Sequence, residues 1–266
     1  MGDFDFDVDA YLERIGAERP KRVDYEALCY LQERHMMSVP FETVDLILKE
    51  FPSLRDEQLY DKIVRRRRGG GCGELNTAFA LLLKGLGYPV TILGARVLHN
   101  GKHAFHGQFM GHMVLRVELD QPYLVDVGFR WASRKPLRLR GRGVQKDAHG
   151  EYELFYSPDG DLEMVHNGVL RWRAEMHPRE IEDFDGPLWF LWTSPDAPAT
   201  TQLWASIVTP GGRVSMFNRV LTEYENGERK FSRVLEDDAE FLQKFETLYG
   251  IRLDAVPDLP VTTEGV

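Results

Sequence analysis

The chain is poor in cysteine and in long apolar segments. Only Cys29 and Cys72 carry thiols among its 266 residues, too few for a disulfide framework. No apolar run approaches the roughly 18–20 residues that a transmembrane helix needs. The opening stretch MGDFDFDVDAYLERIG is acidic and lacks the basic and apolar regions of a signal peptide. We therefore expect a cytoplasmic protein whose thiols stay reduced.

Positive charge is also scarce. The chain has 33 Lys and Arg against 42 Asp and Glu, a formal net charge of -9. This balance argues against nucleic acid and against an anionic membrane as partners. The one basic cluster, Arg65 to Arg68, is short and lies in an acidic background. With 43% hydrophobic and 28% charged residues, the composition is typical of a globular protein.

The first part of the chain has the periodicity and capping residues of helices. Four helices are expected: one capped by Asp9 and ending near Gly16, one capped by Asp24 and running from Tyr25 to about Met37, one starting at a capping box of Ser53 and Asp56, and one starting at or just after Cys72 and stopped by Gly85 or Gly87.

Short alternating runs then predict strands. Strands are expected within 88–98, 112–119, 123–129, 137–141, 152–156, 203–208 and 214–221, the last closed by the turn Asn226-Gly227. Residues 157–210 mix strands with loops, and a final helix spans roughly Asp237 to Tyr249. Helices, then strands, then a small mixed lobe indicate an α+β protein.

The stretch RRRRGGGCGELN is the most informative. Its glycines turn the chain tightly into a helix whose first residue is Cys72. Unpaired N–H groups and the dipole at a helix N-terminus stabilise a thiolate and a developing oxyanion. Arg68 adds positive charge nearby. A small buried apolar residue is the alternative interpretation of Cys72; Cys29, inside an amphipathic helix, is interpreted as a core residue.

A thiolate nucleophile needs a base, and the base needs an orienting acceptor. In HMVLRVELDQPYLVDVGF, apolar residues alternate along two strands, and pairing their apolar faces in a hairpin constrains the register. His112 and Asp126 then share the other face, opposite or diagonal, within hydrogen-bond reach. The alternative is a surface histidine and a capping aspartate.

Other chemistry-bearing residues give weaker signals. His99, His103 and His106 lie in a glycine-containing loop and could form a His-x-x-His metal site. Without cysteine pairs or a carboxylate cluster nearby, we expect no metal. Trp189, Trp192 and Trp204 could line a pocket, but core packing is the commoner role of tryptophan.

Taken in order, five stretches resemble the arylamine N-acetyltransferase family. They are VPFETVDL, KIVRRRRGGGCGELN, HMVLRV, YLVDVGF and residues 187–252, the last ending in FETLYGIRL. The likeness covers nearly the whole chain. It implies an N-terminal helical bundle (1–88), a central antiparallel β-barrel-like domain (89–200) and a C-terminal α/β lid (201–266), with a cysteine-protease-like catalytic core.

The resemblance also implies the chemistry. Acetyl-CoA would acylate Cys72, CoA would leave, and an arylamine, hydrazine or arylhydroxylamine would take the acetyl group, with His112 moving the proton and Asp126 orienting its ring. The resemblance further assigns roles outside this Cys72–His112–Asp126 triad: Glu42 and Arg68 as a supporting pair, Phe41, Val97 and Phe129 at the acceptor, and Gly111, Arg130 and Thr200 at the donor.

Three departures from the family pattern bear on the substrates. Glycines, Gly71 and Gly73, flank the cysteine where aromatic residues are usual, so the pocket floor should be roomier. Arg130 replaces a glycine on the donor path, where it would bind a phosphate or obstruct CoA. In the lid, Ala199, Thr200 and Thr201 replace a usual Ser-Phe pair.

Four functions follow for testing. The first is acetyl transfer from acetyl-CoA to a small aromatic amine or hydrazine. The second is an amide synthase that takes a larger acyl or polyketide chain from an acyl carrier protein. A hydrolytic cysteine protease and a non-catalytic binding protein are the others. The first is favoured, with no nucleic acid, membrane or metal partner.

Overall fold

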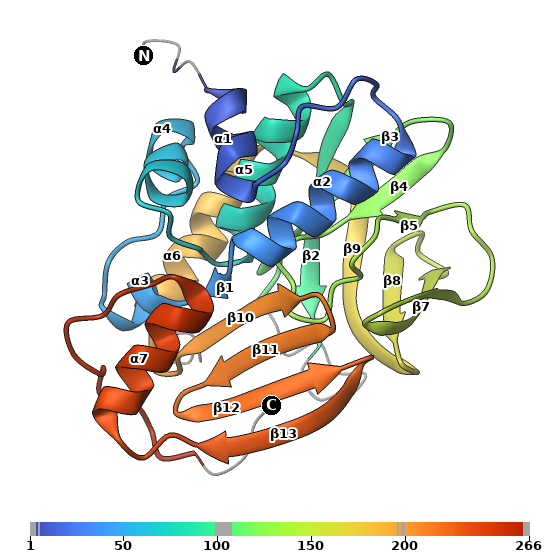
Figure 1. Ribbon diagram of the computed structural model, residues 1–266. Helices are drawn as coiled ribbons and strands as arrows, with labels where there is room; N and C mark the ends of the chain where they lie inside the picture. The colour runs from blue at the N-terminus through green and yellow to red at the C-terminus, as the bar shows by residue number, and fades with distance from the viewer. Residues whose placement is uncertain (1–3, 5, 99–107, 196, 198–199, 263–266) are drawn as a thin grey trace.

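The computed structural model describes residues 4, 6–98, 108–195, 197 and 200–262. The chain packs helices against one large and one small antiparallel sheet, the α+β arrangement expected from the sequence (Figure 1). The helices are α1 (Val8–Ile15), α2 (Tyr25–Ser38), α3 (Val44–Ile47), α4 (Asp56–Tyr60), the π-helix η1 (Asp61–Arg65), α5 (Cys72–Gly85), the 3₁₀ helix η2 (Ile181–Phe184), α6 (Asp185–Thr193) and α7 (Asp238–Tyr249).

The start of α2 agrees with the sequence, and that of α1 does not. The Asp24 side chain accepts a hydrogen bond from Ala27 N at 3.0 Å, as predicted for the start of α2. The cap of α1 is Asp7, whose side chain accepts from Ala10 N; the prediction of Asp9 was wrong because Asp9 lies inside the first turn.

The capping box predicted at Ser53 is also absent. Arg55 precedes the first residue of α4, and Ser53 Oγ instead accepts from Arg55 N at 3.2 Å in a local turn. α4 then continues directly into the π-helix η1, which the apolar pattern does not reveal. The predicted final helix is present as α7, which Asp237 caps and Gly250 ends with a φ of 69°.

The larger sheet curls in a barrel-like manner, and all its pairs are antiparallel (Figure 1). Its order is β5-β4-β3-β2-β9-β8-β7-β6. The strands are β2 (Val90–Val97), β3 (His112–Glu118), β4 (Pro122–Val125), β5 (Leu137–Arg138), β6 (Gln145–Asp147), β7 (Gly150–Tyr156), β8 (Leu162–His166) and β9 (Val169–Arg179).

The smaller sheet has the order β1-β10-β11-β12-β13. Its strands are β1 (Phe41–Glu42), β10 (Trp204–Thr209), β11 (Gly212–Phe217), β12 (Val220–Glu225) and β13 (Glu228–Val234). The single strand predicted over 214–221 is wrong, because Asn218 adopts a positive φ of 49° and the chain reverses there. The Asn226-Gly227 turn therefore joins β12 to β13.

The two-residue strand β1 ties the two ends of the chain together. Phe41 pairs with Ser206 of β10, and it also bridges to Gly70 just before α5. β1 lies in the first expected segment and β10 in the last, so this pairing joins two of the three expected domains. The domain boundaries at 88 and 200 stay a prediction.

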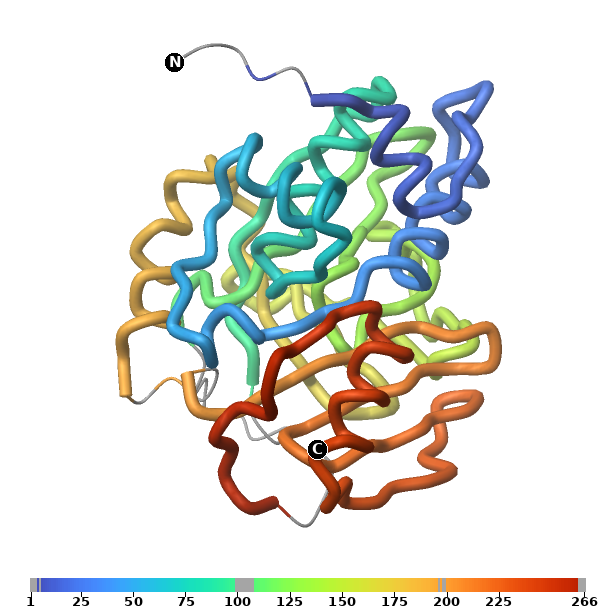
Figure 2. The backbone as a smooth tube through the Cα atoms, turned by 60° about the vertical axis from the view of Figure 1, so that its left-hand side comes forward, coloured from blue at the N-terminus to red at the C-terminus, as the bar shows by residue number. Residues whose placement is uncertain are grey.

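α6 was not expected from the sequence. Residues 157–210 were interpreted as strands and loops, which holds for β8 and β9 but not for η2 and α6. None of the α6 side chains is fully buried, although the helix is rich in apolar residues. Figure 2 shows α6 beside the segment that joins β1 to α4. Trp189 of α6 is 56% exposed, so the expectation of core packing was wrong for this residue.

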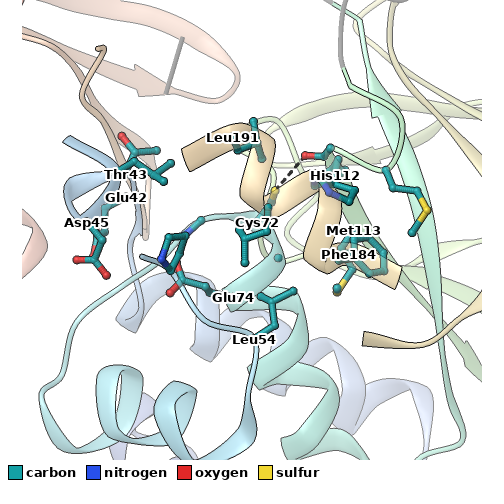
Figure 3. Close-up of a pocket in the computed structure, with 18 of the residues that line it drawn as sticks. Glu42, Thr43, Asp45, Leu54, Cys72, Glu74, His112, Met113, Phe184 and Leu191 are labelled. Atoms are coloured by element: carbon teal, nitrogen blue, oxygen red, sulfur yellow. Dashed lines mark hydrogen bonds between the residues drawn. The ribbon is translucent and has the colours of Figure 1, made fainter. Parts of the chain in front are cut away.

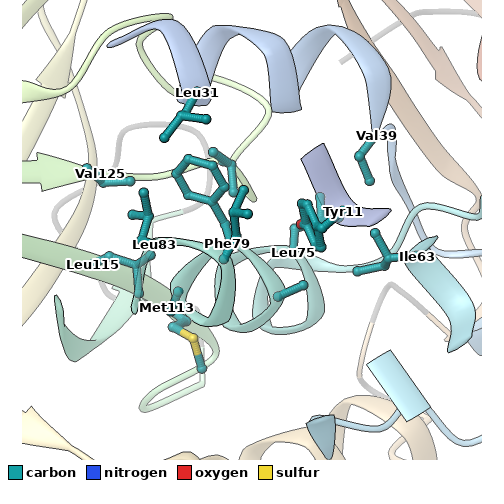
Figure 4. Close-up of a cluster of buried hydrophobic side chains, with 14 of the residues drawn as sticks. Tyr11, Leu31, Val39, Ile63, Leu75, Phe79, Leu83, Met113, Leu115 and Val125 are labelled. Atoms are coloured by element: carbon teal, nitrogen blue, oxygen red, sulfur yellow. The ribbon is translucent and has the colours of Figure 1, made fainter. Parts of the chain in front are cut away.

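The main core lies between the helices and one face of β3 and β4. Figure 4 shows Leu75, Phe79 and Leu83 of α5 packed between α2 and the strands that carry Leu115 and Val125. Cys29 does not belong to this core; it is only partly buried, which contradicts the expectation. Within the described ranges, no helix is both long and apolar enough to span a bilayer.

Candidate active site

Cys72 is the first residue of α5, as the glycine-rich stretch predicts. The chain reaches it through a tight approach, since a Cβ atom on Gly69 would lie 2.0 Å from the carbonyl oxygen of Pro40. Glu74 holds the loop from the helix side: its Oε2 accepts a hydrogen bond from Gly71 N at 2.9 Å. The thiol therefore sits at the N-terminal end of a helix dipole, on a loop with little freedom to move.

His112 and Asp126 come from the hairpin of β3 and β4. The register pairs Leu115 with Val125 and Val117 with Tyr123, so the apolar side chains share the face predicted from their alternation. His112 and Asp126 lie on the other face. His112 Nε2 is 2.8 Å from Asp126 Oδ2, and both side chains are buried.

Asn76 links this hairpin to the cysteine helix. Its Nδ2 donates to Asp126 Oδ1 at 3.0 Å and to the Met113 carbonyl at 2.8 Å, and its Oδ1 accepts from Val127 N at 3.0 Å. Asn76 was not predicted as a site residue. The available signal was its position one helical turn after Cys72, which places it on the same face of α5.

Cys72 lies against the same hairpin (Figure 3). Its Sγ donates to the carbonyl oxygen of Gly111 at 3.6 Å, and a Cβ atom on Gly128 would lie 2.6 Å from Cys72 Cα. Because Asp126 occupies Nε2 of His112, Nδ1 is the ring nitrogen left for exchange with the thiol. Burial opposes the charged imidazolium, but the Asp126 carboxylate, with a smaller effect of Cys72, raises the pKa of His112 to about 10.

A network of buried charged side chains contacts the cysteine loop. The expected pair is present, with Arg68 NH2 2.8 Å from Glu42 Oε1, and Arg68 also contacts Asp45 at 2.7 Å. Lys62, which was not predicted as part of the site, lies 2.6 Å from Asp45 and 2.7 Å from Glu74. Burial lowers the pKa of Lys62, but Glu74, Glu42 and Asp45 together raise it above its usual value.

This network changes the interpretation of Arg68. The sequence suggested that its positive charge acts on the cysteine. In the structure, Glu42 and Asp45 balance the guanidinium, so the role that the contacts support is bracing of the loop.

A cavity of about 60 Å³ opens at the cysteine. One side is lined by Cys72, Gly71, Gly73 and His112. Another side is lined by apolar residues, among them Leu54 from the segment before α4 and Leu191 from α6. A larger cavity of about 570 Å³ adjoins it and is lined by the exposed aromatic residues Phe51 and Trp189. Both cavities are lined by Asp45, Leu54, Lys62, Glu74 and Leu188.

The predicted ligand contacts are divided among several places. Gly111 lines the cavity at Cys72, whereas Phe129 packs on the His112 ring with centroids 5.2 Å apart. Phe41 and Arg130 line a separate small cavity with Trp204. Val97 ends β2, and Thr200 donates to the Ala197 carbonyl at 2.8 Å. None of Phe41, Val97, Phe129, Arg130 and Thr200 lines the cavity at Cys72.

Some predictions cannot be placed. The loop histidines His99, His103 and His106, together with Ala199, lie outside the described residues. In the part of the chain that the structure describes, no three His, Cys, Asp or Glu side chains gather as a metal site would require.

Comparison with known proteins agrees with this geometry. A sequence model of an N-acetyltransferase family matches residues 24–257. The chain is 31% identical to the arylamine N-acetyltransferase pineal gland isozyme NAT-3 of Gallus gallus, over 93% of this chain and 95% of the relative.

Solved structures give the same result. The M. smegmatis arylamine N-acetyltransferase superposes with a TM-score of 0.86 at 31% identity, covering 93% of both chains. The Mycobacterium marinum arylamine N-acetyltransferase in complex with CoA superposes with a TM-score of 0.84 at 30% identity, covering 92% of this chain and 93% of that one. The chain belongs to the arylamine N-acetyltransferase family and is an acyltransferase.

Proposed function

We propose that this protein moves an acetyl group from acetyl-CoA to a small arylamine, hydrazine or arylhydroxylamine through a thioester on Cys72. The observation that carries the proposal is the 2.8 Å contact between His112 Nε2 and Asp126 Oδ2, made on the hairpin that also contacts the thiol. The solved relative in complex with CoA supports the choice of donor.

In the first half-reaction His112 takes the thiol proton of Cys72, and the sulfur attacks the acetyl carbonyl. The N–H groups at the start of α5 stabilise the negative charge that develops on the carbonyl oxygen. The bond to the CoA sulfur breaks, and CoA leaves as a thiol with the proton from His112.

In the second half-reaction the amine nitrogen attacks the thioester carbonyl and gives its proton to His112. The Cys72 sulfur leaves and regains that proton, and the amide product departs. Asp126 keeps Nε2 occupied throughout, so that Nδ1 faces the reacting atoms. Two half-reactions that share one acyl-enzyme give ping-pong kinetics.

Intact-mass measurement after incubation with acetyl-CoA tests the proposal. An acetyl mass gain in the wild type that is absent in Cys72→Ser, and lost on addition of an arylamine, is expected. Acetylation that persists in Cys72→Ser would place the acyl group elsewhere and refute the mechanism.

The larger cavity supports a second candidate, an amide synthase that joins a longer acyl or polyketide chain to an aromatic amine. Gly71 leaves space beside Cys72, since the nearest atom to a Cβ there would be 3.9 Å away. The neighbouring cavity of about 570 Å³ is lined by Phe51 and Trp189 together with charged residues such as Glu50 and Arg66, and its volume suits a long acyl chain that carries polar groups. Mass gain from an acyl carrier protein thioester, without gain from any CoA ester, would select this candidate over the first.

A further inference from the structure

Three arginines surround the indole ring of Trp131. The guanidinium carbons of Arg213, Arg171 and Arg130 lie 4.0, 5.0 and 5.5 Å from its centroid. They come from three elements: Arg130 follows β4, Arg171 belongs to β9 and Arg213 to β11. Within the described ranges, none of the three makes an ion pair with a carboxylate. Such a group of cations needs a physical explanation.

Three nitrogen donors of the cluster lack acceptors among the described residues. Nε of Arg171, Nε of Arg213 and Nε1 of Trp131 are buried and have no hydrogen-bond partner among the described residues. The other nitrogens of Arg213 are partly satisfied, by the Arg130 carbonyl oxygen and by a side-chain hydrogen bond with Tyr224. Folded proteins pair nearly all buried polar groups, so several unpaired donors in one place indicate an absent acceptor.

Electrostatics point the same way. Burial, and then the positive charge of Arg213, lowers the pKa of Arg130 to about 9. Burial also lowers the pKa of Arg213 to about 10, and Arg171 lowers it further while Tyr224 and Tyr152 oppose the change. Asp147 does not relieve this charge, because its oxygens accept from the backbone N–H groups of Arg134 and His149. A bound anion would balance the positive charge of the three arginines.

Arg130 connects the cluster to the segment that contacts the nucleophile. Arg130 is two residues after Gly128, whose backbone packs directly against Cys72. Arg130 also lines a small cavity with Phe41, which bridges to Gly70 of the cysteine loop.

That small cavity is also lined by hydroxyl groups. Ser206, Ser215 and Thr222 are register neighbours across β10, β11 and β12. Ser206 and Ser215 share one hydrogen bond at 3.2 Å and Thr222 shares one with Ser232 at 3.0 Å, which leaves one hydroxyl hydrogen of each pair to donate. Hydroxyl and guanidinium donors together suit a phosphate oxygen.

We propose that Arg130, Arg171 and Arg213 form a binding site for the phosphate that ends the pantetheine arm of the acyl donor. This proposal rests on the proposed function, since it assumes a thioester donor. The phosphate could belong to CoA or to the arm of an acyl carrier protein, which share this chemistry. Arg130 thus binds the donor instead of obstructing it.

Arg171→Met is the most informative variant, because Arg171 is partly exposed whereas the buried Arg213 packs between aromatic rings and its loss threatens folding. Arg130→Met is the second variant. Arg140→Met is the matched control, since Arg140 is exposed and removing it changes the net charge equally. Circular dichroism confirms that each variant is folded.

Steady-state kinetics are measured with acetyl-CoA and with S-acetylpantetheine, which lacks a phosphate. The KM for acetyl-CoA should rise about tenfold or more in Arg171→Met and Arg130→Met, the loss expected for a charge-assisted hydrogen bond. The KM for S-acetylpantetheine should stay unchanged, and Arg140→Met should behave as the wild type. Equal changes for both donors, or no change for acetyl-CoA and for a carrier-bound thioester, would overturn the proposal.

A third donor, an acetylated phosphopantetheine carrier protein, identifies the source of the phosphate. Sensitivity confined to CoA or confined to the carrier supports the site and names its ligand. Should the wild type form no acyl-enzyme with any thioester, the proposed function fails, and calorimetric titration of CoA still tests the arginines. Weaker binding by Arg171→Met than by Arg140→Met would then support the anion site, and equal binding would refute it.

Discussion

His112 and Asp126 are diagonal neighbours in the hairpin of β3 and β4, and their side chains still meet at 2.8 Å. Leu115 pairs with Val125, so continuing the register places Val114 opposite Asp126. The diagonal contact depends on how the Asp126 carboxylate is held. Asn76 and Gly128 N both donate to its Oδ1, which leaves Oδ2 directed at the imidazole. Orientation of the base is therefore built from α5 as well as from the sheet.

Asp126→Asn should slow acylation of Cys72 by about 10³–10⁴-fold while the protein stays folded. The asparagine oxygen would keep the bonds from Asn76 and Gly128, so its NH₂ group would face Nε2 of His112. Nε2 would then have to accept a hydrogen bond from that NH₂ group, so the ring proton would sit on Nδ1, where it cannot take the thiol proton. Single-turnover acylation by acetyl-CoA measures the effect, and a near-normal rate would remove Asp126 from the mechanism.

The stability that His112 contributes should depend on pH. Its folded pKa of about 10 lies above the ordinary value of 6.5. Folding therefore favours the protonated ring, and this contribution is complete below about pH 6.5 and is lost as the pH rises through about 10. The difference in unfolding free energy between wild type and His112→Gln should shrink across that range in urea titrations. A constant difference would contradict the raised pKa.

Lys62→Met should destabilise the fold by about 3–5 kcal/mol, because it leaves buried carboxylates without their cation. Glu74 would lose its 2.7 Å partner, and Asp45 would keep only Arg68. Denaturant unfolding measures the loss. The double variant Lys62→Met, Glu74→Gln should recover part of it, while Lys84→Met, at an exposed position of the same α5, should change little. A Lys62→Met variant as stable as the wild type would show that the network does not support the loop.

Gly73→Phe should narrow the range of acyl groups that Cys72 accepts. A Cβ atom at residue 73 would lie 3.3 Å from Leu54 Cδ2, on the wall between the two cavities. Acylation by p-nitrophenyl decanoate should fall by about tenfold or more relative to p-nitrophenyl acetate, since a ring there fills apolar space. Gly71→Ala is the control, because its Cβ would meet only Glu74 Oε2, at 3.9 Å. A uniform loss with both esters would indicate a distorted loop instead.

Much of this site could be predicted because local rules determine it. The glycines before Cys72 fix the start of α5, and the alternation of apolar residues around His112 and Asp126 fixes the hairpin register. Each signal lies within a short window of sequence, and each reports a backbone constraint that no distant residue overrides.

The missed residues depend on contacts between distant segments. Lys62 follows α4 in a π-helix, and only the fold brings its ammonium group to Asp45 and Glu74. α6 has apolar residues on every side, so no stripe predicted which face would meet the cavity at Cys72. Arg213 gave no local signal either, because its neighbours Trp131 and Arg171 come from other strands and loops.

The short strand β1 has a mechanical consequence. Phe41 pairs with Ser206 of the small sheet, and the next residue, Glu42, donates its N–H to the Gly70 carbonyl at 2.9 Å. The small sheet and the cysteine loop are thus coupled through two adjacent residues. A ligand that moved the small sheet relative to the large sheet would also move the cysteine loop at Gly70, two residues before the thiol. Binding at the small sheet can in this way displace Cys72.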